Sequence, residues 1–368
     1  MKNVRSWSVS AIAAVMLAAC GGGGDGDQSP RVSYTQMVSF GDSLSDIGTY
    51  GTAALKAATG GGKYTVNGTD GKNWTELLAA TLKVSAPCPA QTGLESSGPL
   101  AGFAEAVTNH AGCFNFAQGG ARVTNPVGPA NKALIALGDT SGYVGQMTDP
   151  VVNQINRYLA GQQGNVFSGN ELVTVLAGGN DVFMNLATFS ATVGAGGDAT
   201  AAGTAAVTAM GVAGAELAGY IKALMIAKGA KHVVVVTLPD VSQTPFAYEL
   251  PASVQSLINT MVTTFNAQLT AGLQGTSGVL VVDAYTQGRA QTANLAQYNV
   301  SNATTPACDL TYLAAHVFAS SLVCSTATTL ANTDVSHYQF ADKVHPTPYG
   351  YSLLAKYVTD QMIKAGWL

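Results

Sequence analysis

Short apolar runs alternate along the chain with longer segments whose apolar residues recur at helical spacing. Four runs are apolar over most of their length and predict strands at residues 37–40, 171–176, 231–238 and 278–282. Because these runs show no polar alternation, their strands should be buried on both faces, which is typical of a parallel sheet. The third run contains four consecutive valines and is ended by Pro239.

The segments between these runs predict helices at residues 74–82, 150–160, 200–228, 252–273 and 348–365. Pro150 suits the first turn of the second helix. The third helix is rich in alanine but carries four glycines, which weaken a helix, so we expect it to pack closely against another element. Residues 46–58 fit either a helix or a loop.

Strands that alternate with helices predict an α/β fold, in which a parallel sheet lies between two layers of helices as a three-layer α/β/α sandwich. Loops rich in glycine, aspartate and asparagine follow the predicted strands. Ligands of such folds lie at the carboxyl edge of the sheet, so we expect the functional site there. We interpret residues 33–368 as a single domain with insertions near 84–113 and 286–340.

The N-terminal segment has the pattern of an export signal. Residues 1–19 combine the basic Lys2 and Arg5 with an apolar run that is too short to span a bilayer. Leu17-Ala18-Ala19-Cys20 looks like a bacterial lipobox, whose cysteine is lipidated, and residues 20–32 then form a flexible tether. This predicts a lipid-anchored protein on the bacterial outer membrane or cell surface. An ordinary signal peptide, with a periplasmic or secreted product, is the alternative.

The composition adds two constraints. Apolar residues make up 47% of the chain and charged residues 10%, which suits a large core and an extracytoplasmic protein. The net charge is only −4 and no cluster of lysine and arginine is present, so the composition excludes a nucleic-acid partner. We expect a monomer.

Four cysteines remain beyond Cys20, an even number that favours disulfides in an exported protein. Three pairings are open, and we favour Cys88 with Cys113 and Cys308 with Cys324, because each pair is close in sequence. Four free buried thiols are the alternative. No Cys-x-x-Cys occurs, so nothing indicates a zinc or thioredoxin-like site.

Four short segments carry candidate chemistry: residues 39–46, 115–121, 178–181 and 342–346. Ser43 follows a strand and a glycine turn, so its hydroxyl can project from the sheet edge. A helix that began there would add free N–H groups for an anion. Asp342 lies three residues before His345, so its carboxylate can bind the Nδ1–H of that histidine and leave Nε2 as a base.

These segments contain four motifs in a specific order: Gly-Asp-Ser-Leu at 41–44, Gly-Gly-Ala at 119–121, Gly-Gly-Asn-Asp at 178–181 and Asp-x-x-His at 342–345. The chain thereby resembles the GDSL, or SGNH, hydrolase family over nearly all of its mature body. The first motif alone is weak evidence, whereas all four in order are specific. The resemblance implies a flavodoxin-like α/β/α fold without a metal or an organic cofactor.

The resemblance also implies catalytic roles. Ser43 attacks an ester carbonyl, His345 takes its proton and later protonates the leaving alcohol, and Asp342 orients His345. Three other acidic residues of the motifs should have structural roles and hold loop N–H groups: Asp42, Asp46 and Asp181.

The implied oxyanion hole combines the backbone N–H groups of Ser43 and Gly120 with the side-chain amide of Asn180. Gly120 is preferred to its neighbour Gly119, because the family's glycine donor lies five residues after an asparagine such as Asn115. Asn180 could alternatively cap a helix.

Rival residues exist for the base and its carboxylate. Asp334 and His337 repeat the Asp-x-x-His spacing, but only His345 is followed by a proline and the final helix. Asp283, at the end of a predicted strand, is a further candidate for the orienting carboxylate. The remaining histidines have no acid at that spacing before them: His110, His232 and His316.

We therefore predict an extracytoplasmic carboxylic ester hydrolase that works through an acyl-enzyme and takes a small-molecule or lipid ester as its substrate. An acyltransferase or a carbohydrate acetyl-esterase would use the same triad. A non-catalytic binding lipoprotein would be expected to have lost part of the triad, and every member is present. Four apolar residues that follow Asn180 either line an acyl pocket or pack a helix onto the sheet, and we favour packing: Val182, Phe183, Met184 and Leu186.

Overall fold

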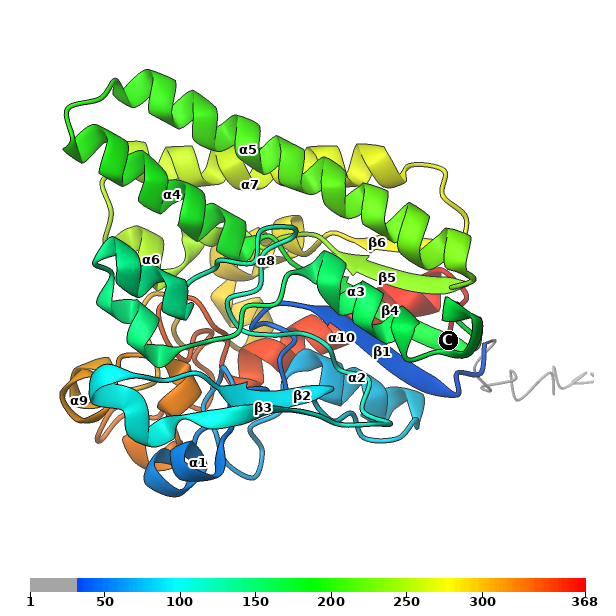
Figure 1. Ribbon diagram of the computed structural model, residues 1–368, viewed down its shortest axis with the longest axis horizontal. Helices are drawn as coiled ribbons and strands as arrows, with labels where there is room; N and C mark the ends of the chain where they lie inside the picture. Colours follow the sequence, from blue (N-terminus) through cyan, green and yellow to red (C-terminus); the bar gives the residue numbers. More distant parts are fainter. Residues whose placement is uncertain (1–31) are drawn as a thin grey trace, which may run out of the picture.

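The computed structural model describes residues 32–368 (Figure 1). Its main sheet has four parallel strands in the order β1 (Gln36–Gly41), β4 (Glu171–Leu176), β5 (His232–Val236) and β6 (Val279–Val282). These are the four predicted strands, and their bounds differ from the prediction by at most two residues. Asn115 also bridges Ser39 in parallel, so the segment around it extends the sheet beyond β1.

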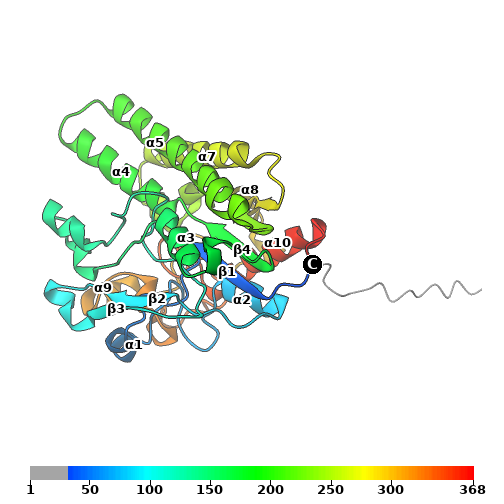
Figure 2. The same cartoon turned by 45° about the vertical axis from the view of Figure 1, so that its right-hand side comes forward.

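Helices cover both faces of the sheet, which confirms the predicted three-layer α/β/α sandwich. One face carries α3 (Val151–Ala160), α4 (Gly179–Gly194), α5 (Ala199–Tyr220) and α7 (Ala252–Leu273). The other face carries α2 (Trp74–Leu82) and α10 (Pro348–Lys364). Figure 2 shows α4, α5 and α7 stacked as a thick layer on one side of the strands.

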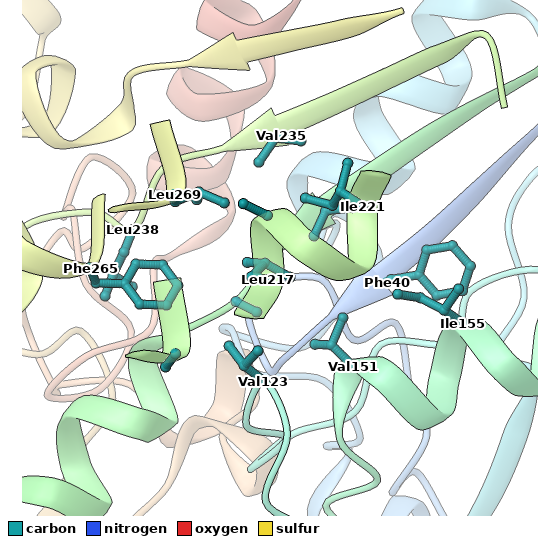
Figure 3. Close-up of a cluster of buried hydrophobic side chains, with 14 of the residues drawn as sticks. Phe40, Val123, Val151, Ile155, Leu217, Ile221, Val235, Leu238, Phe265 and Leu269 are labelled. Carbon is teal, nitrogen blue, oxygen red and sulfur yellow. The ribbon is translucent and has the colours of Figure 1, made fainter. Parts of the chain in front are cut away.

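The main core lies between the sheet and the first of these helical layers (Figure 3). Phe40 of β1 and Val235 of β5 are fully buried there against Leu217 of α5 and Phe265 of α7. Complete burial stabilises each of these side chains by about 2–3 kcal/mol relative to exposure. Strands of both halves of the chain contribute to this core. The core therefore holds the strands in place relative to one another, and with them the carboxyl edge of the sheet on which the motifs lie.

Helix α5 packs closely on α7, as its glycines predict. A Cβ atom at Gly214 would lie 2.3 Å from the carbonyl oxygen of Phe265, so only glycine lets the two backbones approach. Residues 199–228 are long and apolar enough to cross a membrane. In the structure, Met210, Leu217 and Ile221 of this segment are buried in the main core.

The expected insertions hold structure of their own. Residues 84–113, expected only as an insertion, contain a hairpin of β2 (Gln91–Leu94) and β3 (Glu105–Asn109). Disulfides join Cys88 to Cys113 and Cys308 to Cys324, as predicted.

Several short helices complete the described part of the chain. They are α1 (Ala53–Thr59), α6 (Pro245–Tyr248), α8 (Ala284–Ala293) and α9 (Leu310–His316). Residues 46–58, left open between helix and loop, contain most of α1 after a run of turns. The predicted signal peptide, Cys20 and all but the last residue of the tether lie outside the described residues.

Candidate active site

Ser43 lies on a tight turn directly after β1. Asp42 accepts backbone hydrogen bonds from Ser45 and Asp46 at 3.0 and 3.1 Å, and its side chain accepts the N–H of Leu44 at 3.0 Å. The chain turns here without starting a helix, so no helix N-terminus lies behind the serine. The turn leaves Ser43 at the carboxyl edge of the sheet, although the residue is only 8% exposed.

The turn before α10 brings His345 to this serine. Its Nε2 atom lies 2.8 Å from the Oγ of Ser43, and its Nδ1 lies 2.8 and 2.9 Å from the two carboxylate oxygens of Asp342. The backbone N–H groups of Val344 and His345 also donate to Asp342, at 2.9 and 2.8 Å. This tight turn is why a spacing of three residues brings the carboxylate to the imidazole.

Asp342 is buried, and its environment keeps it ionised. Burial alone would raise the pKa of its carboxyl, but the facing His345 and the N–H of Ser321, which donates at 2.8 Å, outweigh burial. The net effect lowers the pKa of Asp342 well below its ordinary value. A carboxylate that stays charged across the physiological range can hold the imidazole in one tautomer and orientation.

The three predicted oxyanion donors come from the turn after β1, the loop at 119–123 and the start of α4. Within residues 32–368, the backbone N–H groups of Ser43 and Gly120 donate no hydrogen bond, whereas the N–H of Gly119 donates to Asp46 at 2.9 Å. The amide of Asn180 uses one hydrogen on the carbonyl of Ala121, at 2.8 Å, and keeps a second one. The free N–H therefore belongs to Gly120, the glycine preferred from the sequence.

Asn180 is the second residue of α4, whose N-cap is Gly178. It is therefore no helix cap, and the residue is only 6% exposed.

The acidic residues of the motifs hold loop N–H groups, as predicted. Asp46 accepts the N–H groups of Gly48 and Thr49 at 2.8 Å in addition to Gly119. Asp181 accepts the N–H of Val123 at 3.0 Å and pairs with Arg122 at 2.9 Å. Burial raises the pKa of both carboxyl groups. These contacts tie the loop at 119–123 to the turn after β1 and to the start of α4.

The rival candidates lie in other contacts. The ring of His337 packs on Tyr349 at a centroid distance of 4.4 Å, and Asp334 is fully exposed. Asp283 caps α8 by accepting the N–H of Thr286 at 3.0 Å. His110 binds the hydroxyl of Thr92, His232 packs between Tyr34 and Trp367, and His316 binds the carbonyl of Tyr312.

A mainly apolar pocket opens beside Ser43 and His345. One wall is α8, and the others come from α4, from the loop after β5 and from the turn before α10. Of the four apolar residues after Asn180, Phe183 lines this pocket, while Val182 and Leu186 are buried in the main core. Packing therefore accounts for Val182 and Leu186, whereas Phe183 both packs against the core and lines the pocket.

Some site residues carry no local sequence pattern. The ring of Tyr64 lies against the imidazole of His345 at a centroid distance of 4.7 Å. The N–H of Ser321 reaches Asp342 from a segment that we expected only to be an insertion. The pocket wall on α8 was likewise not predicted, and only its polar residues at helical spacing could have indicated it.

Among the described residues, no group of three or more histidine, cysteine or acidic side chains is arranged to hold a metal ion. The chain belongs to the GDSL-like lipase/acylhydrolase family, whose model matches residues 37–358, and it is accordingly a carboxylic ester hydrolase.

Comparison with individual proteins adds little to this. No curated protein matches the sequence. Among solved structures, an extracellular lipase from Streptomyces rimosus is 16% identical, with a TM-score of 0.39 over 89% of this chain and 99% of that one.

Proposed function

We propose that the protein hydrolyses carboxylic esters through an acyl-enzyme, with Ser43 as nucleophile, His345 as general base and Asp342 as the orienting carboxylate. The observation that carries the proposal is the unbroken line of contacts from the Oγ of Ser43 through both ring nitrogens of His345 to Asp342. Nucleophile and base within hydrogen-bond reach, with the base oriented by a third group, is the geometry that activates a serine.

In this mechanism the Oγ of Ser43 bonds to the carbonyl carbon while its proton moves to the Nε2 of His345. That proton then goes to the oxygen of the leaving alcohol as the ester bond breaks. A water molecule, deprotonated by the same nitrogen, attacks the acyl-enzyme and releases the acid. Because His345 must be neutral to accept a proton, the rate should fall in acid.

The negative oxygen that forms on the carbonyl would lie among the N–H groups of Ser43 and Gly120 and the free amide hydrogen of Asn180. Donors that are already fixed in place stabilise such a charge without rearranging during the reaction. Asn180 is fixed by its bond to Ala121, and Gly120 by the loop that Asp46 and Asp181 hold.

The experiment is hydrolysis of p-nitrophenyl esters, from acetate to palmitate, by the mature protein and by Ser43→Ala. The wild type should turn over, and the variant should lose about 10⁴-fold or more in kcat. Ser190→Ala, which removes an exposed serine from α4, is the matched control. Equal rates for wild type and Ser43→Ala would contradict the proposal. Product analysis with an added alcohol would separate hydrolysis from acyl transfer.

We further propose that the protein is exported and anchored by a lipid on Cys20. The two disulfides support export, because such bonds form and persist in oxidising compartments. The anchor rests on the lipobox alone. Cys20→Ser should move the protein from the membrane fraction to the soluble fraction, and continued membrane association would contradict the anchor.

A further inference from the structure

The pocket beside Ser43 presents neutral polar groups on the wall that α8 forms. The helix turns one stripe toward the pocket, with residues spaced three and four apart: Ala284, Gln287, Gly288, Gln291 and Thr292. A helix that only packed against an apolar interior would present apolar residues on that stripe. The stripe here is small or polar and carries no charge.

Gln291 is a buried polar residue of this stripe. It is only 6% exposed, yet among the described residues its side-chain amide makes no hydrogen bond. A second pocket residue, Gln339, has a buried side-chain oxygen without a partner. Leaving the buried oxygen of Gln339 unpaired costs about 1–3 kcal/mol, so a donor that enters the pocket would stabilise it. The amide of Gln291 has no partner in the described part of the chain and is free to bind the same occupant.

Two other polar side chains of this pocket, Gln243 and Asp240, already have partners. Gln243 accepts the hydroxyl of Thr292 at 2.5 Å. Asp240 pairs with Arg289 at 2.5 Å and accepts the hydroxyl and the N–H of Ser242 at 2.6 and 2.9 Å. Because the charge of Asp240 is matched, the free hydrogen-bonding capacity of the α8 wall is neutral.

Away from the catalytic residues, much of the remaining lining is hydrocarbon, with Leu44, Phe183, Leu238 and Val344 among its residues. An occupant that matches both the apolar lining and the polar α8 wall has an apolar chain and a neutral oxygen substituent. A hydroxyl group suits a glutamine amide best, because the amide offers both a donor and an acceptor and a hydroxyl uses both.

We propose that Gln291, together with Gln339, binds a hydroxyl or carbonyl group on the part of the ester that occupies this pocket. The inference rests on the esterase function proposed above and names its substrate class: neutral, oxygenated esters in preference to plain fatty esters. A site with unpaired polar groups discriminates strongly against a substrate that lacks the matching group.

The test compares kcat/KM for paired esters in two arms. In the acyl arm, p-nitrophenyl esters of straight-chain acids are used with and without a hydroxyl at successive carbons. In the alcohol arm, alkyl esters of one acid are used with and without a hydroxyl on the alcohol. The wild type should prefer the hydroxylated partner by about tenfold in one arm, which identifies the part of the ester that the pocket holds.

Gln291→Leu should bring that preference close to one. Gln297→Leu removes an exposed glutamine just beyond α8 and should retain the preference. Gly288→Leu checks occupancy of the pocket independently, because no atom lies within 4 Å of the added Cβ. It should lower kcat/KM more for long esters than for acetate.

Three outcomes would overturn the inference while leaving the esterase proposal intact. They are a wild type without preference in either arm, a Gln291→Leu variant that keeps the preference, and a Gly288→Leu variant that treats long esters and acetate as the wild type does. A wild type that hydrolyses no ester in either arm would instead overturn the proposed function.

Discussion

The Nε2 atom of His345 lies 2.8 Å from the Oγ of Ser43, although 302 residues separate the two in the sequence. Ser43 stands on the turn after β1 and His345 on the turn before α10, and the sheet brings both turns to its carboxyl edge. His345 has two supports: Asp342 holds the Nδ1 side of the imidazole, and the ring of Tyr64 lies against its face. The supports can therefore be removed one at a time.

Asp342→Asn should lower kcat by about 10⁴-fold, because an amide next to Nδ1 favours the wrong imidazole tautomer. The matched control is Asp334→Asn, which changes the other Asp-x-x-His pair of the chain. Asp334 is fully exposed and accepts only from Ser336, so that variant should keep wild-type kinetics. Single-turnover kinetics on a p-nitrophenyl ester would measure both rates. Similar losses in the two variants would mean that Asp342 does not orient the base.

Asn180→Ala should lower kcat by about 10²–10³, the effect of removing one oxyanion donor. Asn185→Ala is the control, because Asn185 lies on the same helix and donates to the carbonyl of Asp181 at 2.9 Å. Steady-state kinetics with a thermal melt for each variant would separate catalysis from folding. A kcat equal to that of the wild type would remove Asn180 from the oxyanion hole.

Gly120→Ala should destabilise the protein by about 3 kcal/mol, because the residue has φ of +77° and a Cβ would lie 2.7 Å from the carbonyl oxygen of Pro129. Gly138→Ala shares the left-handed backbone, with φ of +81°, but its Cβ meets no atom within 4 Å. It should cost only about 1 kcal/mol. Urea unfolding measures both free energies of unfolding. Equal losses in the two variants would contradict the prediction, because they would show that the neighbours of Gly120 can move away from an added Cβ.

The disulfide between Cys308 and Cys324 should affect activity as well as stability. Ser321, within the loop it closes, donates to Asp342, and Asn67 donates to the carbonyls of Ser321 and Cys324. Replacing both cysteines by alanine should cost about 2–4 kcal/mol and lower kcat. The equivalent change at Cys88 and Cys113 should cost stability alone. Equal effects of the two double variants on kcat, after correction for unfolded protein, would contradict the coupling.

The sequence predicted what depends on local pattern. Apolar runs located the strands of the main sheet, and the spacing of Asp342 and His345 predicted their contact. Helix α8 was not predicted because Gln287 and Gln291 interrupt its apolar period. The hairpin of β2 and β3 was not predicted because its strands are short and polar. The approach of Tyr64 to His345 depends on the folded chain as a whole, so no local pattern could indicate it.

The stability advantage of Asp42→Asn over the wild type should grow as the pH rises from about 4 to 7. Burial raises the pKa of the Asp42 carboxyl from 3.8 to about 7. The folded protein therefore keeps this proton in a range where the unfolded chain has released it, so the free energy of unfolding falls as pH rises through that window and stays lower above it.

An asparagine does not titrate, and its oxygen can still accept the N–H of Leu44. The difference in unfolding free energy between Asp42→Asn and the wild type should therefore grow in favour of the variant across the window, by a few kcal/mol in total. It should then remain constant above pH 7. Urea unfolding at a series of pH values measures it, with Asp70→Asn in an exposed turn as the control. A difference that does not vary with pH would mean that Asp42 is ionised in the folded protein throughout.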